Sequence, residues 1–320
     1  MIYHIYIIST YHFKERSIKM ICAENLTLKF EDFTALNNLN CSIPDSRIYG
    51  LVGSNGAGKS TFLRLVSGIY RPTSGEVSVD GARIYENPDV KKKIVFVPDD
   101  LYFLPQSNMK TMASLYASVY ENFNYDRFKD LTATFGLDPN KNIGTFSKGM
   151  RRQVSTILAL ASMPEILLFD ETFDGLDPVM RNLVKQVIDH DVRTRNTTTL
   201  ITSHSLRELE DACDQLALLH KGGIVFESDI GDLKTALFKT QVAFSTPYSR
   251  KLIESAGIEM LNYSQLGSVA SFITRGDRDD VRAKLASLDP LLIDILPLRL
   301  EEVFVYEMEA LGYAFKDLNI

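Results

Sequence analysis

The chain lacks the cysteine content of a disulfide-stabilised or metal-binding protein. Its 320 residues include only three cysteines, Cys22, Cys41 and Cys213, with no CxxC pair and no metal-like spacing. Isolated thiols of this kind are typical of proteins that stay in a reducing compartment. We therefore expect reduced cysteines and a cytoplasmic protein.

A long apolar run is also missing from the sequence. A membrane-spanning helix needs about 20 mostly apolar residues in succession, and the best runs, at 153–164 and 291–298, are too short or carry charge. The apolar opening MIYHIYIIST has no basic residue before it and no small-residue cleavage site, so it makes a poor signal peptide. Residues 1–19 are an upstream extension of the reading frame or an appendage, and the sequence leaves both open.

Excess positive charge is the third feature that the chain lacks. Lys and Arg number 35 against 41 Asp and Glu, which gives a net charge of −6. Proteins that track nucleic-acid phosphates usually carry positive excess, so we expect no nucleic-acid partner. The remaining composition, 45% hydrophobic and 24% charged, is that of a folded chain with one large or two modest domains.

The strongest motif lies between a strand-like apolar run at 48–52 and a helix-like run that begins at Ser60. It reads GSNGAGKST and contains the GxxxxGK[ST] pattern of a phosphate-binding loop. Glycines let backbone N–H groups converge on phosphate oxygens, and the helix N-terminus adds its positive dipole end. The lysine of such a loop reaches the β- and γ-phosphates, and the serine hydroxyl can bind Mg²⁺. We expect the nucleotide to contact the loop residues Gly53, Ser54, Asn55, Gly56, Ala57, Gly58, Lys59, Ser60 and Thr61.

A second motif supplies acidic groups for the same chemistry. The buried-strand run at 166–169 ends in Asp170 and Glu171. A carboxylate at the end of such a strand can hold Mg²⁺, and the next carboxylate would be free to act as general base on the attacking water. We therefore expect Asp170 to bind the metal and Glu171 to be catalytic.

Three further motifs follow: FSKGMR at 146–151, GLDP at 175–178 and LITSH at 200–204. With the two motifs above, they resemble, in type and order, the ATPase subunits of ATP-binding-cassette (ABC) transporters, and most of all bacterial exporter-type ATP-binding proteins. In that family they are the signature, the D-loop and the switch histidine. The resemblance spans about residues 20–233 and implies an α/β P-loop ATPase core with an antiparallel β-subdomain and an inserted helical subdomain.

The resemblance also implies the roles of single residues. Two chains of this family sandwich two ATP molecules, so Ser147, Lys148 and Gly149 of the signature would face the nucleotide held by the other chain. Asp177 of the D-loop would contact nucleotide as well. His204 would contact the γ-phosphate and position Glu171 and the water. Phe30 would stack on adenine, with Phe33 as the alternative, although both rings could instead belong to the hairpin core.

The sequence departs from the family pattern at several positions. The Q-loop glutamine is replaced by Asp99, which we expect to serve at the Mg²⁺ site and to contact the nucleotide. Lys148, Gly149 and Met150 replace the commoner Gly-Gly-Gln of the signature, and Thr172 stands where proline usually follows the catalytic glutamate. Because Ser147, Gly149 and Glu171 are present, we interpret these changes as variation within the family.

The predicted organisation has two folded parts after the 1–19 extension. Residues 20–237 form the nucleotide-binding domain, with the helical subdomain at about 101–163, and residues 238–320 form a small α+β accessory domain. Nine aromatic residues between 96 and 135 either line a groove for a partner helix or form the subdomain core. The apolar stripe of the last predicted helix, 299–311, is usually just core, and the alternative is that it docks on the nucleotide-binding domain or on a second subunit.

We predict an ATP- and Mg²⁺-dependent ATPase that energises export through a separate membrane permease, by dimerising with a second copy of itself or with a paralogous ATPase. The chain would then lie on the inner face of the cell membrane. The alternative is a soluble ABC ATPase that acts as an assembly scaffold without a permease. The single phosphate loop argues against translation-factor types, which carry two cassettes, and the short interval between Lys59 and Ser147 leaves no room for the coiled coils of chromosome-associated types.

Overall fold

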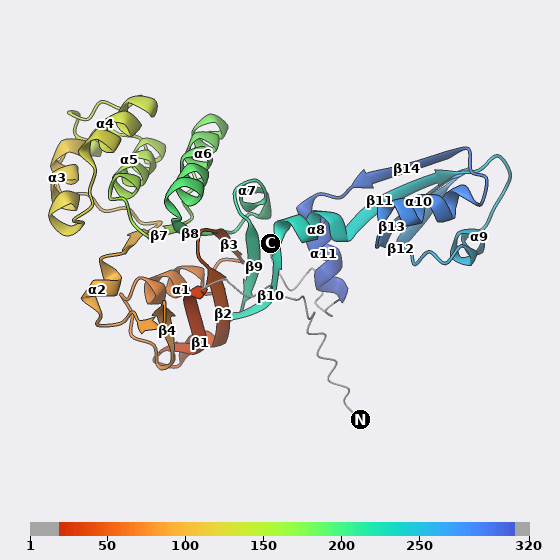
Figure 1. Cartoon of the computed structure of the whole chain (residues 1–320), viewed down its shortest axis with the longest axis horizontal. Helices are drawn as coiled ribbons and strands as arrows, with labels where there is room; N and C mark the ends of the chain where they lie inside the picture. The colour runs from red at the N-terminus through yellow and green to blue at the C-terminus, as the bar shows by residue number, and fades with distance from the viewer. Residues whose placement is uncertain (1–18, 311–320) are drawn as a thin grey trace.

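The structure, a computed structural model, describes residues 19–310 and forms three sheets with helices packed against them. It is the mixed α/β fold that the sequence predicts. The proposed extension at 1–19 lies, apart from Lys19, outside the described residues. Figure 1 shows the predicted nucleotide-binding region, about residues 20–237, on one side, and the sheet of the C-terminal part projecting from it on the other.

The central sheet has the order β10-β9-β3-β8-β7-β6. The five strands from β9 to β6 pair in parallel, and β10 adds an antiparallel edge. Their bounds are Ile48–Val52 (β3), Ile94–Val97 (β6), Ile166–Asp170 (β7), Thr198–Ser203 (β8), Gln215–His220 (β9) and Gly223–Asp229 (β10). Strands β3, β7 and β8 are buried along their whole length, which explains the nearly continuous apolar sequences of β3 and β7.

A four-stranded antiparallel sheet of order β2-β1-β4-β5 covers one face of this region. Its strands are Lys19–Phe30 (β1), Phe33–Pro44 (β2), Ser74–Val79 (β4) and Ala82–Arg83 (β5). Helix α1 (Lys59–Val66) packs between the two sheets through Phe62, Leu63, Leu65 and Val66, and the short helix α2 (Pro88–Lys91) leads into β6.

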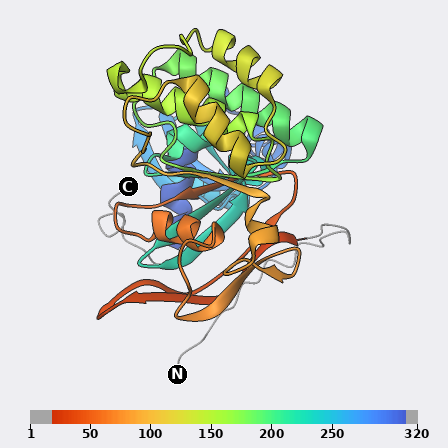
Figure 2. The same ribbon diagram turned by 90° about the vertical axis from the view of Figure 1, so that its left-hand side faces the viewer.

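The opposite face of the central sheet is covered by α3 (Met109–Val119), α4 (Tyr125–Thr134), α5 (Lys148–Ala161) and α6 (Pro178–Arg195). A 3₁₀ turn at Ile143–Thr145 precedes α5. Figure 2 shows these helices stacked above the strands. The aromatic residues of this region mostly form its core, because Phe128 and Phe135 are buried and Phe103, Tyr116, Tyr120 and Phe123 pack against the same cluster. Tyr102 and Tyr125 remain exposed.

Helix α7 (Leu206–Glu210) lies between β8 and β9, and α8 (Ile230–Ala236) connects β10 to the next part of the chain. That part, from β11 to β14 and called the tail below, folds as a βαββαβ unit. Its elements are β11 (Leu237–Ala243), α9 (Arg250–Ser255), β12 (Leu261–Leu266), β13 (Val269–Arg275), α10 (Arg278–Ala286) and β14 (Leu292–Pro297), and its sheet has the order β12-β13-β11-β14. Helices α9 and α10 pack on one face of the sheet through Ile253, Val281 and Leu285, which share a core cluster with Phe238 and Phe272.

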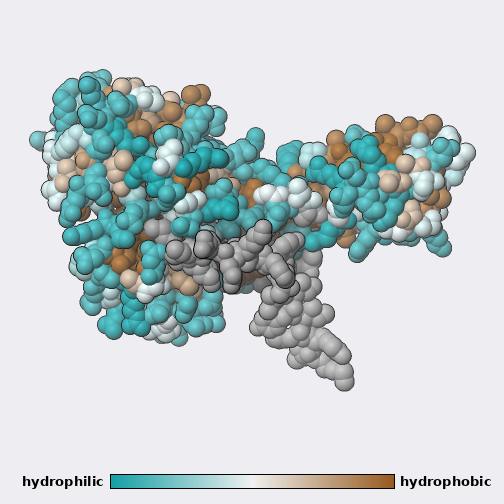
Figure 3. Space-filling model, viewed as in Figure 1, coloured by the Kyte–Doolittle hydropathy of each residue, from teal (hydrophilic) through white to brown (hydrophobic). Residues whose placement is uncertain are grey.

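The far end of the tail sheet exposes apolar side chains. The strand register puts Leu266 opposite Val269, and Ala243 opposite both Val269 and Leu292, so the four residues form one row across the sheet. Leu266 and Leu292 are largely exposed, and Figure 3 shows hydrophobic colour at this end of an otherwise mainly hydrophilic surface. Leu266 and Leu292 therefore leave apolar surface open at this end of the sheet.

The last helix, α11 (Leu300–Ala310), settles the question that its apolar stripe raised. Leu300, Val303, Phe304 and Met308 are buried in the cluster of the nucleotide-binding region, together with Leu206 and Leu209 of α7. The ring of Phe304 meets that of Phe226 on β10 edge to face, with centroids 5.9 Å apart. The helix thus docks on the nucleotide-binding region and not in the tail's own core. Leu311 of the predicted stripe lies outside the described residues.

This docking predicts a large loss of stability for Phe304→Ala. The side chain is 1% exposed, and emptying such a site costs about 3–5 kcal/mol because the cavity collapses only partly. Chemical denaturation should show a markedly lower midpoint for this variant. Tyr102→Ala is the control, since its ring is 77% exposed and surface changes usually stay within about 0.5 kcal/mol. Equal midpoints for the two variants would contradict the docking of α11.

Candidate functional site

The parallel sheet brings the sequence motifs together at one edge. Strands β3, β8, β7 and β6 are neighbours in that order, and all four run in the same direction. Their carboxyl ends therefore meet, which is where ligands bind in open α/β sheets. The phosphate loop follows β3, Asp170 and Glu171 end β7, His204 follows β8, and Asp99 follows β6.

The phosphate-binding loop has a backbone that only glycine can adopt at its end. Gly58 has a φ of 112°, and a Cβ at this position would lie 2.8 Å from the carbonyl oxygen of Ala35. At Gly53, a Cβ would lie 2.4 Å from the carbonyl oxygen of Leu219. These close approaches let the chain turn sharply from β3 into α1, so that the loop's N–H groups lie at the helix start.

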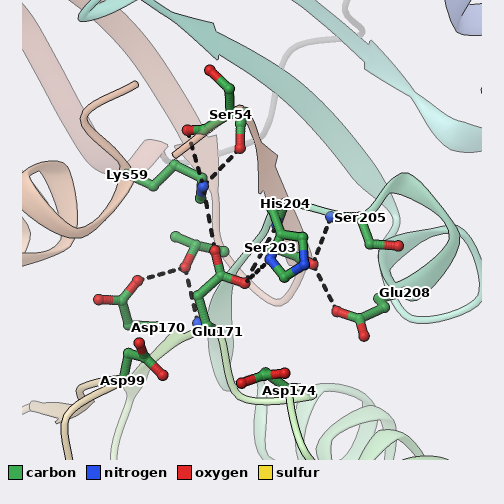
Figure 4. Close-up of polar contacts among 12 residues, drawn as sticks. Ser54, Lys59, Asp99, Asp170, Glu171, Asp174, Ser203, His204, Ser205 and Glu208 are labelled. Carbon is green, nitrogen blue, oxygen red and sulfur yellow. Dashed lines mark hydrogen bonds and ion pairs between the residues drawn. The ribbon is translucent and has the colours of Figure 1, made fainter. Parts of the chain in front are cut away.

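Lys59 lies inside the loop and is 6% exposed. Its Nζ donates to the carbonyl oxygen of Gly53 at 2.7 Å and to that of Ser54 at 3.3 Å. The same ammonium forms an ion pair with Oε1 of Glu171 at 3.3 Å. Figure 4 shows Lys59 pointing from the loop toward Glu171. The carboxylate that follows β7, two strands away from β3, thus balances the charge of the loop lysine.

Asp170 has one oxygen engaged and one free for a further partner. The residue is 1% exposed, and its Oδ1 accepts a hydrogen bond from Thr202 Oγ1 at 2.7 Å. Among the described residues, Oδ2 has no hydrogen-bond partner although it is buried. A buried carboxylate oxygen without a partner is costly. Its position therefore fits a bound cation such as Mg²⁺.

Glu171 lies between the loop lysine and the histidine after β8. Its backbone has a φ of 50°, which is unusual for a residue with a side chain. Its N–H donates to Thr202, to the carbonyl oxygen at 3.2 Å and to Oγ1 at 3.1 Å. Its Oε2 lies 2.9 Å from Nδ1 of the His204 ring. The backbone N–H of His204 also donates to this oxygen, at 3.3 Å. The carboxylate is therefore held from both sides (Figure 4).

The residues after β8 are fixed by a second set of contacts that sequence reasoning missed. Ser203 Oγ donates to Oε2 of Glu208 at 2.7 Å and accepts from the N–H of Ser205 at 3.0 Å. Glu208 also pairs with Arg181 of α6. Figure 4 shows this group beside His204, so it fixes the turn that carries the histidine. The only available signal was polar residues directly around a strand end.

The signature and the D-loop contact each other within the chain. Ser147 caps α5 by accepting from the N–H of Met150, and Lys148 Nζ donates to Oδ2 of Asp174 at 2.8 Å. A Cβ at Gly149 would lie 2.8 Å from the carbonyl oxygen of Gly175. The hydrogen bond from Lys148 holds the pKa of Asp174 below its usual range. In the part of the chain that the structure describes, these hydrogen bonds do not reach the phosphate loop.

The remaining predicted residues lie on exposed turns. Asp177 caps α6 by accepting from the N–H groups of Val179 and Met180. Phe30 and Phe33 face solvent at the tip of the β1–β2 hairpin, where the edge of Phe30 meets the ring of Tyr70 with centroids 5.5 Å apart. Both rings therefore have surface open to a ligand.

Asp99 has a partner that the sequence did not indicate. Nη2 of Arg152, in the second turn of α5, lies 2.7 Å from Oδ1 of Asp99. Nη1 of the same arginine donates to the carbonyl oxygen of Asp170 at 3.4 Å. Arg152 is thus a site residue that sequence reasoning missed, because in the sequence it is only one of several polar residues in a helical run.

Comparison with known proteins agrees with this geometry. Residues 36–174 match the sequence profile of the family described as ABC transporter. The chain is 30% identical over 286 residues to the ABC transporter ATP-binding protein YtrB of Bacillus subtilis (strain 168), a match that covers 89% of this chain and 97% of that protein. It is 28% identical to the bacitracin transport ATP-binding protein BcrA of Bacillus licheniformis, over 67% of this chain and 71% of that protein.

Solved structures show the same fold. An ATP-binding subunit of an ABC transporter superposes with a TM-score of 0.62 at 22% identity, over 67% of this chain and 92% of that one. A dimeric bacterial ABC transporter cassette gives 0.59 at 21% identity, over 66% and 99%. Within residues 19–310, none of the helices combines the length and the apolarity needed to cross a bilayer. With its phosphate loop, acidic strand end and His204 at one sheet edge, the chain belongs to the ABC transporter ATP-binding proteins and is an ATP-binding and ATP-hydrolysing subunit of that family.

Proposed function

We propose that this ATPase powers export through a separate membrane permease, as half of a dimer that sandwiches ATP. Support for export comes from the relatives whose names mention an antibiotic, a lantibiotic or a drug. Besides the bacitracin protein, they include a lantibiotic transport protein of Streptococcus pyogenes and a daunorubicin/doxorubicin resistance protein of Streptomyces peucetius. On this proposal the chain lies on the cytoplasmic face of the membrane, held there by its permease.

The observation that carries the hydrolytic part is the chain of contacts from Lys59 through Glu171 to His204. On ATP binding, the γ-phosphate replaces Glu171 as the anionic partner of Lys59. Glu171 then keeps its contact with His204 and is free to accept a proton from the attacking water. His204 is 54% exposed, so its ring can reach a bound phosphate. Glu171 and His204 thus stay in contact both before and after ATP binds.

We propose that Ser60 and Asp170 hold the Mg²⁺ of the nucleotide. Mg²⁺ in such sites is usually bound by one or two carboxylates together with phosphate oxygens, and Oδ2 of Asp170 is free for this purpose among the described residues. The ion would neutralise charge that develops on the phosphates. The assignment of Asp99 to the metal stays a prediction, and its Oδ1 is engaged by Arg152.

A second chain is needed to complete the site on this proposal. Ser147 caps α5, Lys148 pairs with Asp174, and both side chains are exposed at the start of the helix. On this proposal the start of α5 faces the nucleotide of a partner, and Asp177 contacts nucleotide as well. Phe30, or Phe33 in its place, stacks on adenine in the chain's own site.

This assignment predicts that Gly149→Ala lowers ATP turnover and spares ATP binding. The new Cβ would press on the carbonyl oxygen of Gly175 and displace the signature turn from the D-loop. A misplacement of about 1 Å can cost about a hundred-fold in rate. Phosphate release and ATP-analogue binding should be measured on the same preparations.

Gly231→Ala is the matched control, because a Cβ at Gly231 meets no atom within 4 Å. Its turnover should equal that of the parent. If Gly149→Ala also turned over ATP at the parental rate, the contact between the signature and the D-loop would be irrelevant to catalysis.

The permease is tested by purifying the chain from native membranes and identifying its companions by mass spectrometry. We expect a polytopic membrane protein in near-equal amount that neither salt nor ATP releases. Recovery of soluble companions alone would instead favour the assembly-scaffold alternative. The direction of transport is tested in vesicles reconstituted with that complex. Export predicts ATP-driven uptake into inside-out vesicles.

A further inference from the structure

Arg152 is a charged residue buried inside the helical region. Its side chain is 1% exposed, although it lies close to the start of a helix whose first turn is open to solvent. The guanidinium group stays ionised in proteins. Removing such a charge from water is unfavourable unless a carboxylate and further hydrogen bonds compensate it. The partners of Arg152 therefore show what the buried charge is for.

The guanidinium joins three elements of the nucleotide site. It lies on α5, which carries the signature, and it contacts Asp99 after β6 and the backbone of Asp170 at the end of β7. Among the described residues, the carboxylate that pairs with it is that of Asp99. Its charge also acts on Asp174, just before the D-loop, where it adds to the effect of Lys148 in lowering the pKa of that carboxyl.

The pair also balances charge where ATP would bind. Asp170 and Glu171 already place two carboxylates at this edge, and Figure 4 shows Asp99 beside Asp170. An unpaired Asp99 would add a third negative charge next to the phosphates. Paired with Arg152 at 2.7 Å, it adds no net charge.

We propose that Asp99 and Arg152 are positioning residues that act as one unit. Their ion pair holds the signature helix to the strand ends beside the nucleotide, and it keeps the Asp99 carboxylate from binding Mg²⁺. This inference rests on the proposed nucleotide site and adds the coupling of that site to α5. It gives Asp99 a different role from the metal ligand that the sequence predicts.

The test is a double-variant cycle of Asp99→Asn and Arg152→Gln, read by the binding of a fluorescent ATP analogue with Mg²⁺ and with EDTA. Arg152→Gln should weaken binding about tenfold in both conditions, because it leaves a free carboxylate beside the phosphates. Asp99→Asn should bind at least as tightly as the parent but melt at a lower temperature, because a buried cation loses its partner. The double variant should return to within about twofold of the parental affinity.

Arg152→Lys is the conservative variant and should keep the parental affinity, since it retains the charge. It also shows whether the weaker binding of Arg152→Gln comes from the lost charge or from misfolding. The proposal is overturned if Asp99→Asn weakens binding only when Mg²⁺ is present, which is the behaviour of a metal ligand. Additive losses in the double variant would overturn it too. If the parent itself bound no ATP analogue, the proposed nucleotide site would fail as well, and that outcome is distinct from a loss of coupling alone.

Discussion

Glu171→Gln should bind ATP, hydrolyse it about a hundred- to ten-thousand-fold more slowly than the parent, and accumulate as a dimer. This range is what a general base contributes. The amide can still bond to Nδ1 of His204, so the geometry of the site is retained. Since the variant also removes the anionic partner of Lys59, the lysine is free for the γ-phosphate. Phosphate release measures the first effect, and light scattering with ATP and Mg²⁺ measures the second.

The control for this experiment is Glu121→Gln, which neutralises a carboxylate that is 81% exposed and pairs with Lys92, before the amino end of β6. It should behave as the parent in both assays. Parental turnover in Glu171→Gln would show that another group activates the water. Slow turnover without a dimer would keep Glu171 as the base but remove the support for a shared site.

Lys59→Ala should weaken ATP binding by about ten- to a hundred-fold. Hydrogen bonds to charged groups are worth about 1.5–3 kcal/mol each, and every 1.4 kcal/mol corresponds to about tenfold in affinity. The loss has a second source here, because Glu171 would be left without its cation next to the incoming phosphates. Binding of an ATP analogue should be compared with that of Lys251→Ala, which removes an exposed lysine in the tail.

The double variant Lys59→Ala with Glu171→Gln separates these two sources. If ATP replaces Glu171 as the partner of Lys59, the double variant should bind ATP more tightly than Lys59→Ala alone, because the repelling carboxylate is gone. Equal affinities would mean that Glu171 does not face the phosphate position. The proposal that the γ-phosphate replaces Glu171 as the partner of Lys59 would then be wrong. The assignment of the phosphate loop to ATP binding would not be affected.

The meeting of the predicted site motifs could be expected because each is a local pattern that a parallel sheet brings to one edge. Lys59, Asp170 and His204 each follow or end a short apolar run, and the sequence shows these runs directly. Once the runs are parallel neighbours, their carboxyl ends meet. The α/β fold class and the ATPase activity could therefore be predicted before any coordinates.

Partners that depend on packing between distant segments could not be predicted in this way. Arg152 is one of two adjacent arginines in RRQ, and no periodic pattern distinguishes it from exposed Arg151. Only the placement of α5 over the ends of β6 and β7 buries it against Asp99. A pair between residues far apart in the chain depends on the whole fold, and one sequence carries no signal for it.

The last helix shows the same division. Its apolar stripe, with Val303 and Phe304, was evident from helical spacing, because an amphipathic helix must bury one face. The surface that it covers was not evident, since leucine and phenylalanine bury equally well against any apolar patch. The sequence by itself determined the nucleotide chemistry and the elements that carry it. Tertiary structure alone decided that α11 docks beside α7 and that Asp99 meets a buried arginine, because burial and charge pairing depend on which distant surfaces come into contact.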